Sequence, residues 1–160
     1  MKLSFKLVQT PAGSRIVLGG AINEDVKSLL AANESQMAPN ITVDFADVSF
    51  INSCGTRDWA LFIHRTSHRA SFVYENCTED VIMQINMVPE FAGNAAIKSV
   101  NRTFECESCK TKETLHLVAG TDFEMGKIPH ARDVPCRSCG KATEAMEDDE
   151  EFFQFLLKSA

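Results

Sequence analysis

The chain has 160 residues, an apolar fraction of 44% and a formal net charge of −6. This composition is that of a folded protein and excludes an intrinsically disordered one. No run of about 18 apolar residues occurs, and residues 1–10 lack the apolar core and cleavage site of a signal peptide, so we expect no membrane span and a cytoplasmic location.

The negative charge is concentrated near the C-terminus. Residues 142–160 contain six acidic residues and one basic residue, whereas residues 101–141 contain six acidic and seven basic residues. An acidic surface repels nucleic acid, so only the middle segment is suited to approach a phosphate backbone. We therefore do not expect nucleic acid to be the main partner.

The first part of the chain alternates between strand and helix patterns. Residues 3–9 and 14–20 are apolar stretches around a proline- and glycine-containing turn, which predicts a β-hairpin. Residues 21–37 have the apolar spacing of a helix, with Asn23 as the predicted N-cap. Residues 41–51 alternate between apolar and polar side chains, which is typical of a half-buried strand.

The same alternation continues along the next 50 residues. Residues 57–69 predict a helix, residues 70–77 a short strand, residues 78–88 a third helix, and residues 95–104 a last strand. The order β-β-α-β-α-β-α-β over residues 1–104 predicts an α/β fold with a mixed β-sheet.

Four of the six cysteines form two C-x-x-C pairs. Each pair places two thiolates on one tight turn, and two such turns can share one tetrahedral zinc ion. A closed site with four cysteines has no open position, so it is structural rather than catalytic. The predicted ligands are Cys106, Cys109, Cys136 and Cys139.

The residues between the two pairs leave alternatives open. Two redox disulfides or unliganded thiols would also fit the pattern, and His116 or His130 would be able to replace one cysteine as a ligand. Gly140 suits the turn after the last cysteine because glycine accepts a positive φ. With its two knuckles, the segment 105–142 resembles a zinc ribbon, a family that binds nucleic acid or proteins.

The stretch ITVDFADVSFINSCGTRDWALFIHR, residues 41–65, resembles the core of the STAS family, which includes the sporulation anti-sigma-factor antagonists. In that family an apolar–Asp–apolar strand leads through V-x-F-I-(D/N)-S-(S/T)-G into a helix. The resemblance covers residues 1–104. It implies a bacterial signalling regulator that binds a kinase-like or anti-sigma-like protein partner and has no enzymatic activity of its own.

The match departs from the antagonists at the position that carries their switch. There the serine directly before the glycine is phosphorylated by the partner kinase, but Cys54 stands at that position in this chain. Asn52 replaces the usual aspartate, and Ser53 matches the preceding serine. Ser53 and Thr56 remain the alternative phosphate acceptors.

Cys54 has two possible roles. A helix N-terminus favours a thiolate, and Arg57 three residues later adds to this effect, so Cys54 would be able to act as a redox sensor. Alternatively it is a small, half-buried residue that fills a turn. The partner-binding or switch junction is predicted to comprise Asn52, Ser53, Cys54, Gly55, Thr56 and Arg57.

The last segment, 143–160, combines an acidic run with a cluster of apolar residues. The pattern predicts an acidic linker followed by an amphipathic C-terminal helix. Its apolar face packs either on its own domain or on a partner, and a second copy of the chain would give a homodimer. The apolar residues are Phe152, Phe153, Phe155, Leu156 and Leu157.

Overall fold

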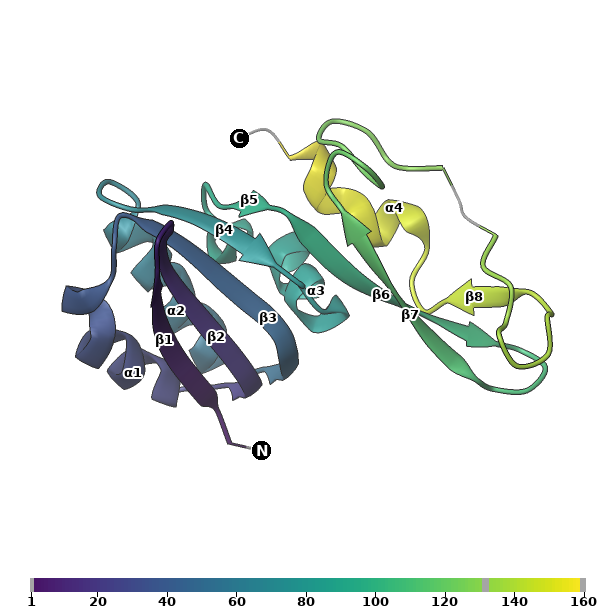
Figure 1. Cartoon of the computed structure of the whole chain (residues 1–160), viewed down its shortest axis with the longest axis horizontal. Helices are drawn as coiled ribbons and strands as arrows, with labels where there is room; N and C mark the ends of the chain where they lie inside the picture. Colours follow the sequence, from purple (N-terminus) through teal and green to yellow (C-terminus); the bar gives the residue numbers. More distant parts are fainter. Residues whose placement is uncertain (1, 131–132, 159–160) are drawn as a thin grey trace.

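The computed structural model describes residues 2–130 and 133–158 and contains two β-sheets (Figure 1). The first sheet has five strands in the order β1-β2-β3-β4-β5, with β1 antiparallel to β2 and the other neighbours parallel. The predicted α/β fold with a mixed sheet is therefore confirmed. The strands are β1 (Ser4–Thr10), β2 (Gly13–Ile22), β3 (Asn40–Ile51), β4 (Ser71–Glu75) and β5 (Ala96–Ile97).

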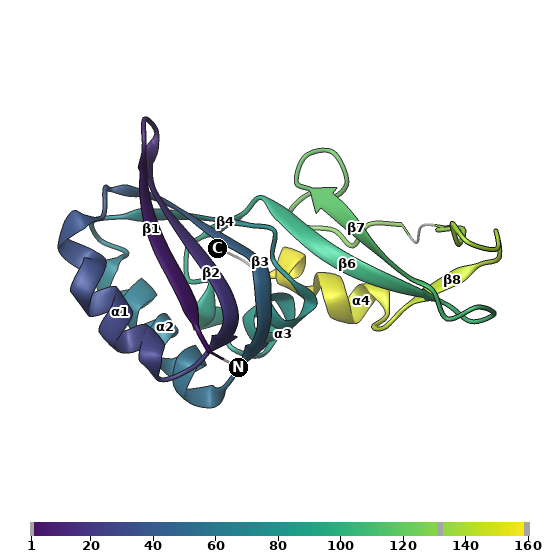
Figure 2. The ribbon, with the colours of Figure 1, turned by 60° about the horizontal axis from the view of Figure 1, so that its bottom comes forward.

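Three helices pack on one face of this sheet (Figure 2). They are α1 (Asp25–Asn33), α2 (Ser53–Thr66) and α3 (Glu79–Met87), and the 3-10 turns η1 (Glu34–Gln36) and η2 (Pro89–Phe91) follow α1 and α3. None of the helices within the described residues has the length and hydropathy to cross a membrane.

Two helix boundaries differ from the prediction. The first helix ends at Asn33 and continues only as a 3-10 turn, and its N-cap is Glu24 rather than Asn23. The second helix begins at Ser53, four residues before the predicted start. Apolar periodicity marks helix ends poorly, because the start of α2 is set by the polar cap residue Asn52 and not by an apolar residue.

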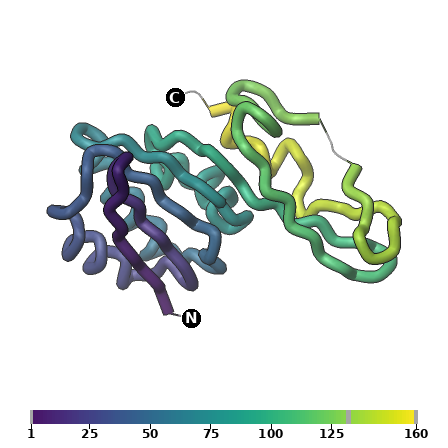
Figure 3. The backbone as a smooth tube through the Cα atoms, in the orientation of Figure 1, coloured from purple at the N-terminus to yellow at the C-terminus, as the bar shows by residue number. Residues whose placement is uncertain are grey.

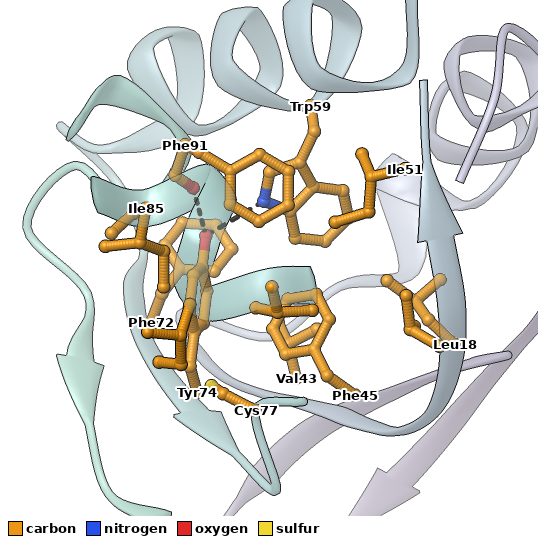
Figure 4. Close-up of a cluster of buried hydrophobic side chains, with 14 of the residues drawn as sticks. Leu18, Val43, Phe45, Ile51, Trp59, Phe72, Tyr74, Cys77, Ile85 and Phe91 are labelled. Atoms are coloured by element: carbon orange, nitrogen blue, oxygen red, sulfur yellow. Dashed lines mark hydrogen bonds between the residues drawn. The ribbon is translucent and has the colours of Figure 1, made fainter. Parts of the chain in front are cut away.

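The core between the sheet and the helices is built around aromatic side chains (Figure 4). The rings of Phe45 and Tyr74 meet edge to face, with centroids 4.9 Å apart. Trp59 Nε1 donates a 2.9 Å hydrogen bond to Tyr74 Oη, which donates to the carbonyl oxygen of Phe91 at 2.7 Å. These hydrogen bonds give the buried indole N–H of Trp59 and the hydroxyl of Tyr74 a partner, which offsets the cost of removing both groups from water.

The opposite face of the sheet carries an ionic network. Arg15 contacts Asp44 at 2.7 Å and Glu75 at 2.8 Å, and Lys98 contacts Glu75 at 2.8 Å. Burial tends to raise the pKa of Asp44, but hydrogen bonds from Asn76 and Arg15 outweigh it and hold that pKa below its ordinary value. Asp44 therefore stays ionised and helps to order the centre of this face.

The second sheet is antiparallel and has the order β7-β6-β8. The single strand predicted for residues 95–104 is two strands in the structure, because β5 ends at Ile97 and the longer strand begins at Ser99 in the other sheet. Cys77 joins the sheets here, since its N–H donates to Ser99 O and its carbonyl oxygen accepts from Asn101 N. The strands are β6 (Ser99–Cys106), β7 (Lys112–Val118) and β8 (Thr143–Ala145).

The C-terminal segment folds back between the second sheet and α3 (Figure 3). It forms α4 (Asp149–Phe152) and the 3-10 helix η3 (Phe153–Leu157). Lys158 Nζ donates to the last carbonyl oxygens of α3, at Ile85 and Asn86. Of the two alternatives for the apolar residues, packing on their own chain holds for four of the five, whereas Leu157 is exposed; the buried residues are Phe152, Phe153, Phe155 and Leu156.

Arg102 of β6 binds the C-terminal segment to the second sheet. Its side chain is 4% exposed, forms an ion pair with Asp149 and stacks on the rings of Phe152 and Phe153, with the guanidinium carbon 4.7 Å and 5.2 Å from their centroids. A guanidinium held between a carboxylate and aromatic faces is a favourable arrangement for a buried charge. The C-terminal segment is thus an integral part of the fold.

Candidate metal centre and strand-to-helix junction

The four predicted cysteine ligands converge at the far end of the second sheet. Their sulfur atoms all lie within 4.8 Å of one another, and the closest pairs, Cys106–Cys139 and Cys109–Cys136, are 3.5 Å apart. A tetrahedral zinc–thiolate site with bonds of about 2.3 Å requires sulfur–sulfur distances of about 3.8 Å. The cluster therefore fits a metal ion, and its sulfur separations are too long for disulfides.

Two turns of the same geometry present these thiols. Lys110 N donates to Cys106 O at 2.9 Å, and Gly140 N donates to Cys136 O at 2.8 Å. Lys110 has a φ of 61° and Gly140 a φ of 73°. The positive φ expected for Gly140 is confirmed, and Lys110 adopts the same left-handed conformation at the matching position of the first turn.

The thiols perturb one another strongly. Hydrogen bonding with the hydroxyl and the backbone amide of Thr111, and with the Cys136 thiol, lowers the pKa of Cys109 to about 6. The backbone amide of Lys141 acts to lower the pKa of Cys139. Hydrogen bonding with the Cys106 thiol, burial and the two remaining thiols outweigh this effect and raise the pKa to about 11. Several thiolates at this spacing repel one another, and a bound cation would remove that repulsion.

The histidines do not join the cluster. His116 Nδ1 lies 2.8 Å from Asn101 Oδ1 on the second sheet, and His130 lies beside Asp122 and Phe123 in a loop hollow. Among the described residues, the metal-ligand group contains cysteines alone. The alternative with a histidine ligand is therefore wrong.

Asn52 and Gly55 give the strand-to-helix junction its shape. Asn52 caps α2, because its Oδ1 accepts from Gly55 N at 2.7 Å, and its Nδ2 donates to Glu24 Oε2 at 3.1 Å. Gly55 lies against β2, where a Cβ atom would be 2.2 Å from the carbonyl oxygen of Ile22. Only glycine lets α2 begin this close to the strand.

The remaining junction residues divide into buried and exposed groups. Thr56 is 7% exposed, and its hydroxyl is bonded to Asn52 O at 3.0 Å and to Gln84 Oε1 at 2.9 Å. Ser53 is exposed, and the Arg57 side chain is 63% exposed while its Nε contacts Asp58 at 3.0 Å. Cys54 is half-buried. Ser53 and Arg57 are therefore the positions that a partner can reach.

Sequence patterns did not predict a hollow of about 740 Å³ beside this junction, between α2 and the end of α3. Ser53, Thr56 and Arg57 line one end, and the exposed side chains of Leu61 and Met87 line its sides. The signal was present in the sequence, because the helical spacing of Val81, Ile82 and Ile85 leaves Met87 on the opposite side of the helix. This hollow places an apolar surface next to the accessible junction residues.

Comparison with known proteins assigns no family. No protein-family model matches the sequence, and no curated protein matches it either.

Proposed function

We propose that this chain is a non-enzymatic protein-interaction module with a structural zinc ion. In this proposal residues 1–104 form a STAS-like domain and residues 105–142 form a zinc ribbon. Residues 143–160 form a C-terminal segment that contacts both. The accessible junction residues beside an apolar hollow carry the proposal, because binding surfaces combine an apolar centre with polar groups at the rim.

Zinc is the metal that the donor set favours. Four cysteine sulfurs at tetrahedral spacing select a soft ion such as zinc, and no ligand position is left open for chemistry. When bound, the ion would supply folding free energy to a sheet whose outer strands, β7 and β8, bury only Leu117. It also holds the two turns in a fixed orientation.

Metal analysis and chelation test the zinc proposal. Purified protein should contain one equivalent of zinc, and Cys106→Ser should lose it, whereas Cys54→Ser should retain it. Removal with a strong chelator should reduce amide protection in residues 99–118 more than in residues 40–51. Metal-free protein with unchanged protection in both ranges would refute a structural role.

The partner proposal is tested at the exposed junction positions. We infer a protein partner, kinase-like or anti-sigma-like, from the resemblance at residues 41–65. Affinity capture from the native host extract should recover one partner with the full chain, and Arg57→Glu should abolish its recovery. Lys27→Glu, on α1, serves as the matched charge control. Equal recovery with Arg57→Glu and the unaltered chain would refute binding through the junction.

Ser53 is the phosphate acceptor in this proposal. Its side chain is exposed in the first turn of α2, whereas the Thr56 hydroxyl is already bonded and covered. A phosphate at a helix N-terminus is favoured by the helix dipole and lies one turn from Arg57. Ser53→Asp should therefore change partner affinity, and mass spectrometry of the recovered protein should find phosphate on Ser53.

A further inference from the structure

The exposed face of α3 separates two hollows. On one side lies the hollow of about 740 Å³ described above, and on the other a cleft of about 630 Å³ between α3 and the C-terminal segment. Met87 borders both, and Met83, one turn earlier, borders the cleft. Met87 exposes 66% of its surface and Met83 exposes 38%. Leu61 of α2 exposes 56%.

We call this area the Met87 surface and define it by Leu61, Met83, Met87 and the acidic wall of the cleft. Exposed large apolar side chains gathered around hollows mark interaction sites. Methionine is suited to such a role, since its flexible, polarizable side chain adapts to the shape of what it contacts. The charge on the opposite wall of the cleft, formed by the C-terminal segment, determines which class of partner can bind.

The acidic wall consists of carboxylates without an ion pair of their own among the described residues, and the nearby cation Arg102 is already paired with Asp149. Glu147, Asp148, Glu150 and Glu151 line the cleft, and none of them forms an ion pair there. Burial, followed by the charges of Glu79 and Glu151, raises the pKa of Glu147. The carboxylates therefore repel one another, and a partner that brings positive charge would relieve this repulsion.

We propose that the Met87 surface binds a basic amphipathic helix of a partner protein. The proposal deepens the proposed function, on which it rests, because the larger hollow begins at Ser53 and Arg57 of the junction. The apolar side of the incoming helix contacts Leu61, Met83 and Met87. Its lysine or arginine residues lie against the acidic wall.

Shape and charge together favour a helix over other ligands. An α-helix with its side chains is about 10–12 Å wide and presents anchors at every third or fourth position, which matches a groove beside another helix. A small apolar molecule in the larger hollow would make no contact with the four carboxylates, which line the other cleft. Nucleic acid is repelled by them.

Fluorescence anisotropy with designed peptides tests this pairing on the full, zinc-loaded chain. The probes are two labelled 18-residue amphipathic peptides with the same leucine positions, one with lysine and one with glutamate on the polar face. The lysine peptide should bind, and its affinity should fall as salt rises from 0.05 to 0.5 M. Absence of binding, or equal binding of both peptides, overturns the proposal.

Substitutions then locate the site. Met87→Asp should weaken binding of the lysine peptide at least about tenfold, as expected for a central apolar contact. Glu150→Gln combined with Glu151→Gln should weaken it and reduce its salt dependence. The matched control is Met125→Asp, at a methionine that is 61% exposed and lines neither hollow, and it should have no effect. Equal effects of Met87→Asp and Met125→Asp overturn the assignment.

The two proposals can fail separately. If Arg57→Glu abolishes recovery of the native partner while Met87→Asp leaves both recovery and peptide binding unchanged, the junction proposal stands and the Met87 surface is refuted. If Met87→Asp abolishes lysine-peptide binding while Arg57→Glu leaves native recovery unchanged, the Met87 surface stands and the junction proposal is refuted.

Discussion

Gly55 lies in the first turn of α2, where alanine would ordinarily stabilise a helix by about 0.5–1 kcal/mol. In this protein the added Cβ would lie 2.2 Å from Ile22 O and 2.6 Å from Ile22 C. Both are backbone atoms, and Ile22 O also accepts a 3.0 Å hydrogen bond from Asn52 N. Neither can move unless β2 separates from the start of α2.

The expected cost follows from these contacts. Overpacking of a tight site costs about 1–3 kcal/mol, and loss of the Asn52–Ile22 hydrogen bond adds about 1 kcal/mol. After the helix propensity gain is subtracted, Gly55→Ala should lower the free energy of unfolding by about 1–3.5 kcal/mol. For a chain of this size the midpoint of thermal unfolding would fall by about 2–14 °C.

Urea unfolding followed by fluorescence measures this change. Trp59 is the only tryptophan of the chain and is fully buried between α2 and the sheet, so its emission reports on this part of the core. Ser53→Ala, at the exposed start of the same helix, is the control and should change stability by less than about 0.5 kcal/mol. A Gly55→Ala variant as stable as the parent would show that the steric argument is wrong.

Three further experiments test separate parts of the fold. Arg102→Met should cost about 3 kcal/mol because it leaves the Asp149 carboxylate without its cation, and adding Asp149→Asn should restore much of the loss in urea unfolding. Burial raises the pKa of the Cys77 thiol, so an alkylating reagent at pH 7.5 should modify Cys54 well before Cys77, and equal rates would contradict the packing. Asp44→Asn should lower stability at pH 7. Because the folded-state pKa of Asp44 lies below its ordinary value of 3.8, this difference should shrink as the pH falls below 3.8 and through that lower pKa, whereas a difference that did not change with pH would contradict the ionic origin.

The elements that sequence patterns predicted best are those with a local cause. The strand Asn40–Ile51 follows from strict alternation of side chains, and the cysteine cluster follows from the spacing within each C-x-x-C pair. The break between β5 and β6 at Lys98 was not predictable in this way. It depends on pairing with Tyr74 and Cys77, more than 20 residues away, and apolar periodicity does not indicate which sheet a strand joins.

The cysteine turns illustrate the same limit on a smaller scale. Gly140 was identifiable as a left-handed position because of its residue type, but Lys110 has the same conformation without that signal. A lysine held at positive φ costs about 1 kcal/mol, which the bonding of the turn and its cysteines must offset. The conformation is therefore imposed by the converging thiols rather than by the local sequence.

The junction motif can be understood as two sets of residues with different causes. Asn52 caps the helix, Gly55 permits its approach to β2, and Thr56 bonds it to α3, so these three are explained by folding alone. A similar motif in another protein would arise from the same geometry whatever its function. Ser53 has no such structural requirement, because it faces solvent, whereas the exposed Arg57 side chain also forms an ion pair with the buried Asp58 carboxylate. A regulatory role is therefore tested most cleanly at Ser53, and a substitution of Arg57 needs an unfolding measurement beside the binding assay.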